Sequence, residues 1–246
     1  MTDSSISLSG HYRQVLEQIE QSAIRAGRQP GDVRLVAVSK TRSLAEVQAL
    51  ASLGQRDFGE NTLQDAMTKI PVFQDAAMAG PSEIEWHFIG HLQKNKANKV
   101  PGNFQWLHTV DDLRLVQKLS TAIQRNAQAP VLNCLMQVNV SGEQSKSGLS
   151  PDEVLPFIDE LFKLDLAGLR WRGLMTIGVM GNDSETRRAF AELRMLADRV
   201  RQHTGMAEFD QLSMGMSDDY PAAIEEGATM VRVGSSIFGP RNYQTP

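Results

Sequence analysis

The amino-acid sequence predicts an α/β protein that folds as a single (β/α)8 TIM barrel with an extra N-terminal helix. Short β-rich runs alternate with longer amphipathic stretches, and this alternation is typical of parallel βα units. Eight such units fit into 246 residues, which matches the usual size of a closed barrel. A doubly wound open sheet is the competing fold, but it usually has a glycine-rich turn after its first strand. Here Ser39, Lys40 and Thr41 follow the first strand instead.

The expected elements follow one another in a regular order. An amphipathic helix at about 7–27 precedes the first strand. The expected strands span residues 33–39, 57–60, 85–89, 106–110, 133–140, 169–175, 209–214 and 230–234. Helical periodicity is clearest at 43–54, 111–127 and 184–203. Four serines stand where N-cap residues are expected, and two glycines stand where helices should end: Ser43, Ser150, Ser184, Ser217, Gly54 and Gly227.

Composition bounds the domain organisation and the partners. No linker divides the chain, so we expect one domain over residues 1–246, with the barrel at about 33–240. A net charge of −4 gives no electrostatic reason to expect nucleic acid or an anionic membrane as the main partner. No apolar run approaches the roughly 20 residues that span a bilayer. The N-terminus lacks the features of a signal peptide, and the single cysteine, Cys134, fits a packed thiol in a reducing compartment. We therefore expect a cytoplasmic protein.

Candidate site residues are sought where strands end, because barrel chemistry lies at the C-terminal ends of the strands. The polar residues and glycines at those positions are Lys40, Asn61, His91, Asp111, Asn139, Thr176, Ser213, Gly215, Ser217, Gly234, Ser235 and Ser236. The loops after the last two strands, 213–219 and 233–239, are rich in glycine and serine. Barrels commonly bind phosphate in these two loops through backbone N–H groups and hydroxyls. Two tight turns with capping serines are the alternative interpretation.

Lys40 stands at the end of an apolar strand, where a charged amine is costly unless it has a use. Apolar surroundings disfavour the charged form of a lysine, and a neutral amine can form a Schiff base with an aldehyde. A lysine that reaches solvent or pairs with a carboxylate is the alternative. A phosphate site and a reactive lysine in one barrel mouth predict a ligand with both a phosphate and an aldehyde. Pyridoxal phosphate is the commonest such ligand, and a phosphorylated sugar is the other candidate.

Arg232 lies two residues before Gly234 and therefore points to the same face of the last strand, into the barrel. One expected partner is an inward carboxylate such as Glu60. The other interpretation places Arg232 against the pyridine nitrogen of the cofactor. Because arginine does not give up its proton, it would leave that nitrogen unprotonated and the ring a weaker electron sink.

Three other signals are weaker. His87 and His91 have the spacing of a helical zinc pair but flank a strand, so we expect no metal site there. The basic run 91–99 is read as a solvated helix face. Lys146 lies in the loop after the fifth strand, where it could contact an anion or be a second reactive amine, although loop lysines are usually only solvated.

Several motifs together resemble the pyridoxal 5′-phosphate homeostasis proteins, which are PLP-binding barrels of fold type III related to the N-terminal domain of alanine racemase. The matching segments, in chain order, are LVAVSKT, FGEN, WHFIGHLQKNK, QVNVSGEQSKSGL, GLMTIG, LSMGMSDD, AAIEEGATMVRVGSSIFG and RNY. They extend from about residue 33 to residue 243. The combination of SMGMSDD with VRVGSSIFG is the most specific part of the resemblance.

The resemblance implies a cofactor site and a role. Lys40 would hold pyridoxal phosphate as a Schiff base, Asn61 would line the ring pocket, and Arg232 would face the ring nitrogen. The phosphate would be cradled by Ser213, Gly215, Met216, Ser217, Gly234 and Ser235. The implied role is vitamin B6 homeostasis without classical catalysis, in which the protein holds the cofactor and hands it on, with PLP-dependent apo-enzymes as candidate recipients. It leaves open whether the chain is a monomer or a weak dimer.

Two catalytic alternatives stay open at this point. A PLP-dependent amino-acid racemase needs an acid/base on each face of the ring, and related racemases take one, a tyrosine, from a second domain. The tyrosines here are Tyr12, Tyr220 and Tyr243, and none has an obvious place beside Lys40. A Schiff-base aldolase acting on a phosphorylated sugar is less expected, because such sites usually recruit further acids and lysines near the amine.

Overall fold

The computed structural model describes residues 7–75, 84–126, 129–143, 146–178 and 182–240. The strands are β1 (Arg34–Val38), β2 (Asp57–Glu60), β3 (Glu85–Phe88), β4 (Trp106–Val110), β5 (Leu132–Gln137), β6 (Leu169–Met175), β7 (Gln211–Ser213) and β8 (Met230–Val233). Neighbouring strands are parallel and follow chain order, and β8 pairs with β1 to close the barrel. The predicted (β/α)8 barrel is therefore confirmed.

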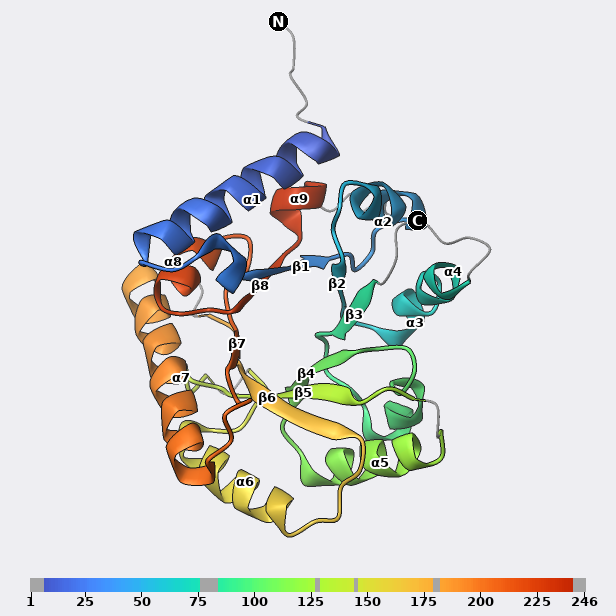
Figure 1. The fold of residues 1–246 in the computed structure, drawn as a ribbon, viewed down its shortest axis with the longest axis vertical. Helices are drawn as coiled ribbons and strands as arrows, with labels where there is room; N and C mark the ends of the chain where they lie inside the picture. Colours follow the sequence, from blue (N-terminus) through green and yellow to red (C-terminus); the bar gives the residue numbers. More distant parts are fainter. Residues whose placement is uncertain (1–6, 76–83, 127–128, 144–145, 179–181, 241–246) are drawn as a thin grey trace, which may run out of the picture.

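Helices surround the ring of strands (Figure 1). They are α1 (Leu8–Arg25), α2 (Leu44–Ser52), α3 (Leu63–Ala66), α4 (Ile70–Gln74), α5 (Leu113–Gln124), α6 (Val154–Phe162), α7 (Asp183–Thr204), α8 (Tyr220–Glu225) and α9 (Ser235–Phe238). Short 3-10 helices are η1 (Pro30–Asp32), η3 (Lys94–Lys99) and η4 (Pro151–Glu153). The expected leading helix is α1, which packs beside α8 and α9 outside the barrel. None of the helices in the described ranges could cross a lipid bilayer.

Capping residues explain where several helices begin and end. Ser43 caps α2 as predicted, and its hydroxyl accepts from the N–H of Glu46 in a reciprocal capping box. The predicted cap at Ser184 is wrong, because the side chain of Asn182, two residues earlier, caps α7. The predicted cap at Ser217 is also wrong, since α8 begins after Asp219. The hydroxyl of Ser217 is instead bonded to backbone N–H groups of the loop after β8.

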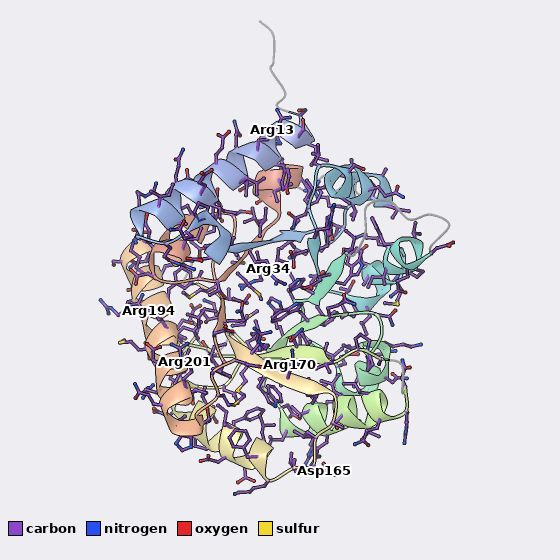
Figure 2. All side chains as sticks on the ribbon, in the orientation of Figure 1. Arg13, Arg34, Asp165, Arg170, Arg194 and Arg201 are labelled. Carbon is purple, nitrogen blue, oxygen red and sulfur yellow. The ribbon has the colours of Figure 1, made fainter. Side chains whose placement is uncertain are left out.

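The strands separate two kinds of interior. Outside the barrel, apolar side chains of the strands pack against the helices in one continuous core. Inside the barrel, the apolar layer is small and consists of Trp106, Leu135, Met175 and Met230. Side chains fill this interior, and Arg34 lies among them (Figure 2). Barrels of this fold usually fill the inside with branched apolar residues, so the polar groups found there call for a physical explanation.

Candidate functional site

A pocket opens at the C-terminal ends of the strands. Its volume is about 370 Å³, which lies within the range of small-molecule sites. The lining residues are Val38, Lys40, Arg42, Asn61, Ile89, Gly90, Met175, Ile177, Met216, Ser217, Asp218, Arg232, Gly234 and Ser235. We call this cavity the Lys40 pocket. It brings together seven of the predicted site residues: Lys40, Asn61, Met216, Ser217, Arg232, Gly234 and Ser235.

Lys40 is placed in the pocket by a sharp change in the backbone directly after β1. The side chain of Lys40 is half-buried. The next residue, Thr41, has φ of 62°, and it is the one non-glycine residue with positive φ in the described ranges. A left-handed conformation costs a threonine roughly 1–2 kcal/mol, so surrounding contacts must hold it. This turn ends the strand and leaves the amine of Lys40 at the pocket wall.

Those contacts come from a buried ionic cluster behind the barrel wall, which we call the outer cluster and which consists of Ser39, Glu60, Asp65 and Lys69. The Nζ of Lys69 donates to Glu60 Oε1 at 2.8 Å, to Asp65 Oδ1 at 2.9 Å and to the carbonyl oxygen of Ser39 at 2.8 Å. Asp65 Oδ2 in turn accepts from the backbone N–H of Thr41 at 2.6 Å. One buried lysine therefore fixes the residues on both sides of Lys40.

The outer cluster contains a carboxyl that titrates near neutral pH. Burial raises the pKa of Glu60 to about 7, although hydrogen bonds from Lys69 and Ser39 act in the opposite direction. Glu60 Oε2 is buried and has no hydrogen-bond partner among the described groups. Burial also acts to raise the pKa of Asp65, but the bonds from Thr41 and Lys69 outweigh it and leave that pKa lowered. The sequence suggested Glu60 as a partner of Arg232, and this was wrong because Glu60 faces outward to Lys69.

Arg232 forms part of the pocket floor and is only 4% exposed. Its Nη1 donates to Ser213 Oγ at 2.8 Å, and its Nη2 donates to the carbonyl oxygen of Thr176 at 2.9 Å. Burial lowers the pKa of Arg232 to about 10, with Asp219 acting in the opposite direction. The guanidinium thus stays protonated at neutral pH and offers the pocket a donor that does not accept.

The loops after β7 and β8 meet at one end of the pocket. The hydroxyl of Ser217 accepts from the backbone N–H groups of Gly234 at 3.3 Å and Ser236 at 3.4 Å. A Cβ on Gly234 would lie 3.2 Å from the carbonyl oxygen of Val38. A side chain there would be crowded against the backbone of Val38, so glycine suits this close approach of the two backbones. Converging N–H groups and hydroxyls of this kind are suited to an anionic group.

Two predicted phosphate contacts are placed elsewhere. Ser213 is fully buried below Arg232, where its hydroxyl contacts Arg232 and His108. Gly215 is buried with φ of 91°, and a Cβ there would lie 2.5 Å from the Cβ of Ala223 in α8. Neither residue lines the pocket. Their assignment to a phosphate stays a prediction, and the geometry favours a role for Ser213 beneath Arg232.

Asn61 reaches the pocket because the backbone of the neighbouring loop passes very close to it. A Cβ on Gly90 would lie 1.9 Å from the carbonyl oxygen of Asn61, so no side chain fits at Gly90. The loops after β2 and β3 are therefore in direct backbone contact at the pocket rim. Asn61 also lines a second groove that runs outward past His91 and Lys96.

Sequence reasoning missed several residues of the pocket wall. Ile89, Met175 and Ile177 supply apolar surface, and Arg42 adds a second guanidinium. Alternation along the strands could have identified the first three, since Met175 and Ile177 are two residues apart and share a face. Arg42 Nη2 donates to the carbonyl oxygen of Gly239 at 2.5 Å and so ties the β1 loop to the end of α9.

The residues that gave weaker signals in the sequence lie outside the Lys40 pocket. The Nζ of Lys146 is bonded to Glu143 Oε1 at 2.6 Å and to the carbonyl oxygen of Gly178 at 3.0 Å, and it does not line the Lys40 pocket. His91 is exposed on the neighbouring groove. The run 91–99 contains the 3-10 helix η3. The Cys134 thiol is buried, and burial raises its pKa, as expected of a packed thiol.

Comparisons with known proteins agree with this architecture. The family model of the alanine racemase N-terminal domain matches residues 14–242. Proteins named pyridoxal phosphate homeostasis protein from Pseudomonas aeruginosa and Escherichia coli K12 are each 44% identical to the chain. The first comparison covers 98% of both chains. The second covers 96% of this chain and 97% of the relative.

Solved structures also resemble the chain. PipY from Synechococcus elongatus with PLP bound has a TM-score of 0.76 and 32% identity, covering 92% of this chain and all of that one. An alanine racemase from Clostridium difficile has a TM-score of 0.70 at 14% identity, covering 95% of this chain and 58% of that one. The second likeness concerns the fold alone.

Proposed function

This chain belongs to the alanine racemase N-terminal domain family and, within it, to the pyridoxal phosphate homeostasis proteins, and from this premise we propose that it binds pyridoxal phosphate in the Lys40 pocket. The observation that carries the proposal is that Lys40, Arg232 and the Ser217 loop line one cavity. An amine, a guanidinium and an anion-binding loop are the groups that an aldehyde, a ring nitrogen and a phosphate require. The role of such a protein is to hold the cofactor for vitamin B6 homeostasis.

The residues present fit this ligand in two respects. Gly234 packs its backbone against Val38, where a Cβ would be crowded, and the N–H groups of Gly234 and Ser236 converge on the hydroxyl of Ser217. Apolar side chains of Val38, Ile89 and Ile177 line the same pocket as Lys40 and Arg232, as a ring requires. When bound, pyridoxal phosphate supplies an electrophilic aldehyde carbon, a pyridine nitrogen and a phosphate.

Each residue then has a defined task. Lys40 would hold the cofactor through its Nζ, because a lysine amine can form a reversible Schiff base with an aldehyde. Arg232 would donate to the ring nitrogen and so favour its unprotonated form, because a pKa of about 10 leaves the guanidinium a donor at neutral pH. Met216, Ser217, Gly234 and Ser235 would hold the phosphate. Asn61 closes the remaining side of the ring.

A carrier is favoured over a racemase by what surrounds the pocket. Two-base racemization needs a second acid/base opposite the lysine. Of the tyrosines in the described ranges, Tyr12 donates to Gln55 at 3.1 Å and Tyr220 is buried in α8, and neither lines the pocket. Tyr243 lies outside the described residues. We propose that residues 1–246 act as one cytoplasmic binding domain, a monomer or weak dimer, which passes the cofactor to PLP-dependent apo-enzymes.

Reduction and peptide mapping test the proposal. The protein is incubated with pyridoxal phosphate, its visible spectrum is recorded, and borohydride then fixes the adduct for mass spectrometry. We expect a phosphopyridoxyl group on Lys40, and its complete loss in Lys40→Ala. Lys163→Ala, at an exposed lysine that follows the last residue of α6, serves as the control and should bind like the wild type.

Two results would contradict the proposal. One is a colourless protein that binds no added cofactor, which would favour a phosphorylated sugar and the aldolase alternative. The other is an adduct on Lys146 in place of Lys40. Turnover of amino acids by the loaded protein would favour the racemase.

A further inference from the structure

A chain of hydrogen bonds crosses the inside of the barrel, from the pocket floor to the opposite end. It runs from Arg232 to Ser213, from Ser213 Oγ to His108 Nδ1 at 2.9 Å, from His108 Nε2 to His87 Nδ1 at 2.9 Å, and from His87 Nε2 to Asp57 Oδ1 at 3.0 Å. We call these five residues the inner chain. Both histidines are fully buried.

The direction of donation along the inner chain follows from its two ends. Arg232 can only donate, so Ser213 Oγ accepts from it and turns its own hydrogen to His108 Nδ1. His108 then carries its proton on Nε2 and donates to His87 Nδ1. His87 carries its proton on Nε2 and donates to Asp57, which as a carboxylate can only accept. Every group donates once to the next, and both imidazoles are neutral.

A second arrangement would satisfy fewer groups. His87 could be a cation that donates to both neighbours, with His108 donating from Nδ1 to Ser213. The hydroxyl hydrogen of Ser213 would then have no acceptor among the described groups. Burial also lowers the pKa of His87, against the effect of Asp57, and lowers the pKa of His108 well below its usual value. The neutral, one-way arrangement is therefore favoured.

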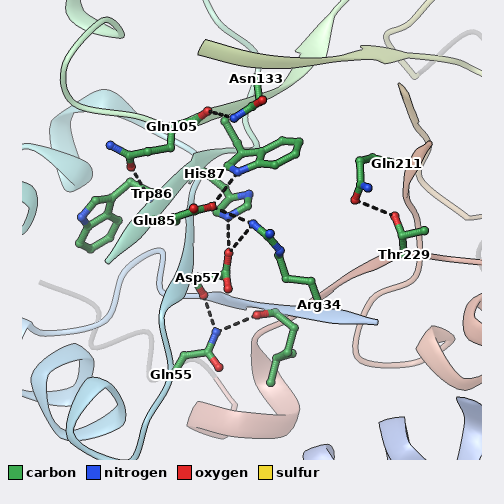
Figure 3. A network of polar contacts seen from close by, with 12 residues as sticks. Arg34, Gln55, Asp57, Glu85, Trp86, His87, Gln105, Asn133, Gln211 and Thr229 are labelled. Atoms are coloured by element: carbon green, nitrogen blue, oxygen red, sulfur yellow. Dashed lines mark hydrogen bonds and ion pairs between the residues drawn. The ribbon is translucent and has the colours of Figure 1, made fainter. Parts of the chain in front are cut away.

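The lower end of the inner chain is held by charged groups. Arg34 Nη1 donates to Asp57 Oδ1 at 3.0 Å and to Glu85 Oε2 at 2.7 Å, as Figure 3 shows. The ring of His87 is stacked on Trp106 with an angle of 5° between the planes. Asp57, Glu85 and His87 have the composition of a metal site, but the guanidinium of Arg34 is paired with both carboxyl groups. The acceptor end of the inner chain is thus held by an ion pair.

We propose that His87 and His108 are positioning residues that hold Arg232, through Ser213, in the orientation with which it meets the ring of the bound ligand. The inference rests on the proposed function for the ligand, but the arrangement of the inner chain can be measured without it. An arginine side chain is flexible, so hydrogen bonds are needed to fix the orientation of its guanidinium at the pocket floor. Two of its donors are committed, to Ser213 and Thr176, which leaves the others available to the pocket.

The protonation pattern is the first test, and it uses the ligand-free protein. In ¹⁵N-histidine NMR spectra we expect both rings in the Nε2–H form, with a scalar coupling from the Nε2–H of His108 to Nδ1 of His87. A proton on His108 Nδ1, or a cationic His87, would contradict the direction of donation along the inner chain. His87→Gln and His108→Gln assign the signals.

The second test asks whether the chain positions Arg232. In His108→Phe, we expect the guanidinium N–H signals of Arg232 to exchange at least tenfold faster, and the affinity for pyridoxal phosphate to fall about tenfold with a shifted absorption maximum. The glutamine of His108→Gln can still accept from Ser213 and donate to His87. The Arg232 exchange rate and the affinity of this variant should therefore stay within twofold of the wild type, with an unshifted absorption maximum. His203→Phe, at an exposed histidine on α7, is the matched control.

The outcomes separate this inference from the proposed function. Wild-type exchange rates in His108→Phe would overturn the positioning role, whether or not the ligand binds. Faster exchange in that variant, together with a wild-type protein that binds no pyridoxal phosphate, would support the positioning of Arg232 and reject the ligand. If His108→Phe does not fold, the same quantities are compared between His108→Gln and His87→Leu. His87 is the next residue of the inner chain after His108, so His87→Leu interrupts the same series of hydrogen bonds.

Discussion

The outer cluster and the inner chain each support one functional side chain of the Lys40 pocket, but they do so by different chemistry. The outer cluster is ionic and holds the backbone on both sides of Lys40 through Lys69. The inner chain joins two neutral imidazoles and a hydroxyl, and it holds the guanidinium of Arg232. A backbone position is thus fixed by charge pairing, whereas a side-chain orientation is fixed by directional hydrogen bonds.

The two networks also respond to pH with opposite sign. The pKa of Glu60 is about 7 in the folded protein and 4.5 without the fold, so the folded state binds more protons between these values. Stability from this group is present at low pH and is lost as pH rises through that window. The histidines of the inner chain have lowered pKa values. Their contribution is present above about pH 6.5 and is lost as pH falls.

The largest expected effect comes from removing the cation of the outer cluster. Lys69→Met leaves Glu60 and Asp65 without their shared partner, and breaking a buried ion pair typically costs about 3–5 kcal/mol. Urea unfolding at pH 8 should show this loss, and the loss should shrink at pH 5, where Glu60 is neutral. Lys163→Met, at a lysine that is 67% exposed, should change the free energy of unfolding by less than about 0.5 kcal/mol.

Glu60→Gln should sharpen the contrast between the networks. Glutamine resembles the protonated carboxyl, so the variant and the wild type should have similar stability at pH 5. At pH 8 the variant should be more stable by about 3 kcal/mol, which follows from the shift from 4.5 to about 7. Chemical unfolding across this range measures the difference. A stability difference between Glu60→Gln and wild type that does not change with pH would mean that the pKa of Glu60 is not raised in the folded protein.

His108→Gln should show the opposite slope. Glutamine keeps both hydrogen bonds of the inner chain but does not titrate, so the variant lacks the stability that wild type gains as pH rises from 5 to 7. We expect the stability of the variant relative to wild type to fall by about 1–2 kcal/mol over this range. The same series of unfolding curves supplies the measurement. If the stability of His108→Gln relative to wild type instead rises with pH, as expected for Glu60→Gln, the two networks do not respond to pH with opposite sign.

The smallest effect is expected at Thr41. Because its φ is 62°, Thr41→Gly should relieve the left-handed strain and leave the bond from its N–H to Asp65 in place. Glycine also makes the unfolded chain more flexible, so the net gain should stay below about 1 kcal/mol. Thermal unfolding compares it with Thr121→Gly, an exposed site in α5 that should lose stability. A loss at Thr41 as well would show that the strain relieved at this residue is smaller than the cost of the more flexible unfolded chain.

Much of the fold could be predicted from the sequence because its signals are local. Strands β2, β4 and β6 have the expected boundaries. The expected fifth strand was too long: β5 ends at Gln137, because the Asn139 side chain folds back onto the carbonyl oxygens of Glu143 and Lys146. Such bonds within a loop have no periodic signature.

The pocket was predictable in part for the same reason. Strand ends and alternation correctly indicated that Lys40 and Arg232 point toward one cavity. The partners of Arg232 could not be predicted, because Ser213 comes from the neighbouring strand and His108 from the far side of the barrel. Glu60 was assigned to Arg232 although its side chain points outward. The tilt of the strands and the register of the barrel decide which side chains share a layer, and neither is written in a local pattern.

The sequence by itself determined the order of strands and helices, the amine at the end of β1, and the glycine and serine loops that meet at the pocket. These depend on periodicity and turn chemistry, which act over a few residues. Only the tertiary structure decided that Lys69 holds the turn beside Lys40 and that His87 and His108 join Arg232 to Asp57. Closing the barrel links Asp57 to Arg232, which are more than 170 positions apart in sequence, through hydrogen bonds of three intervening side chains. It also buries both histidines between them, where an unpaired polar group is costly.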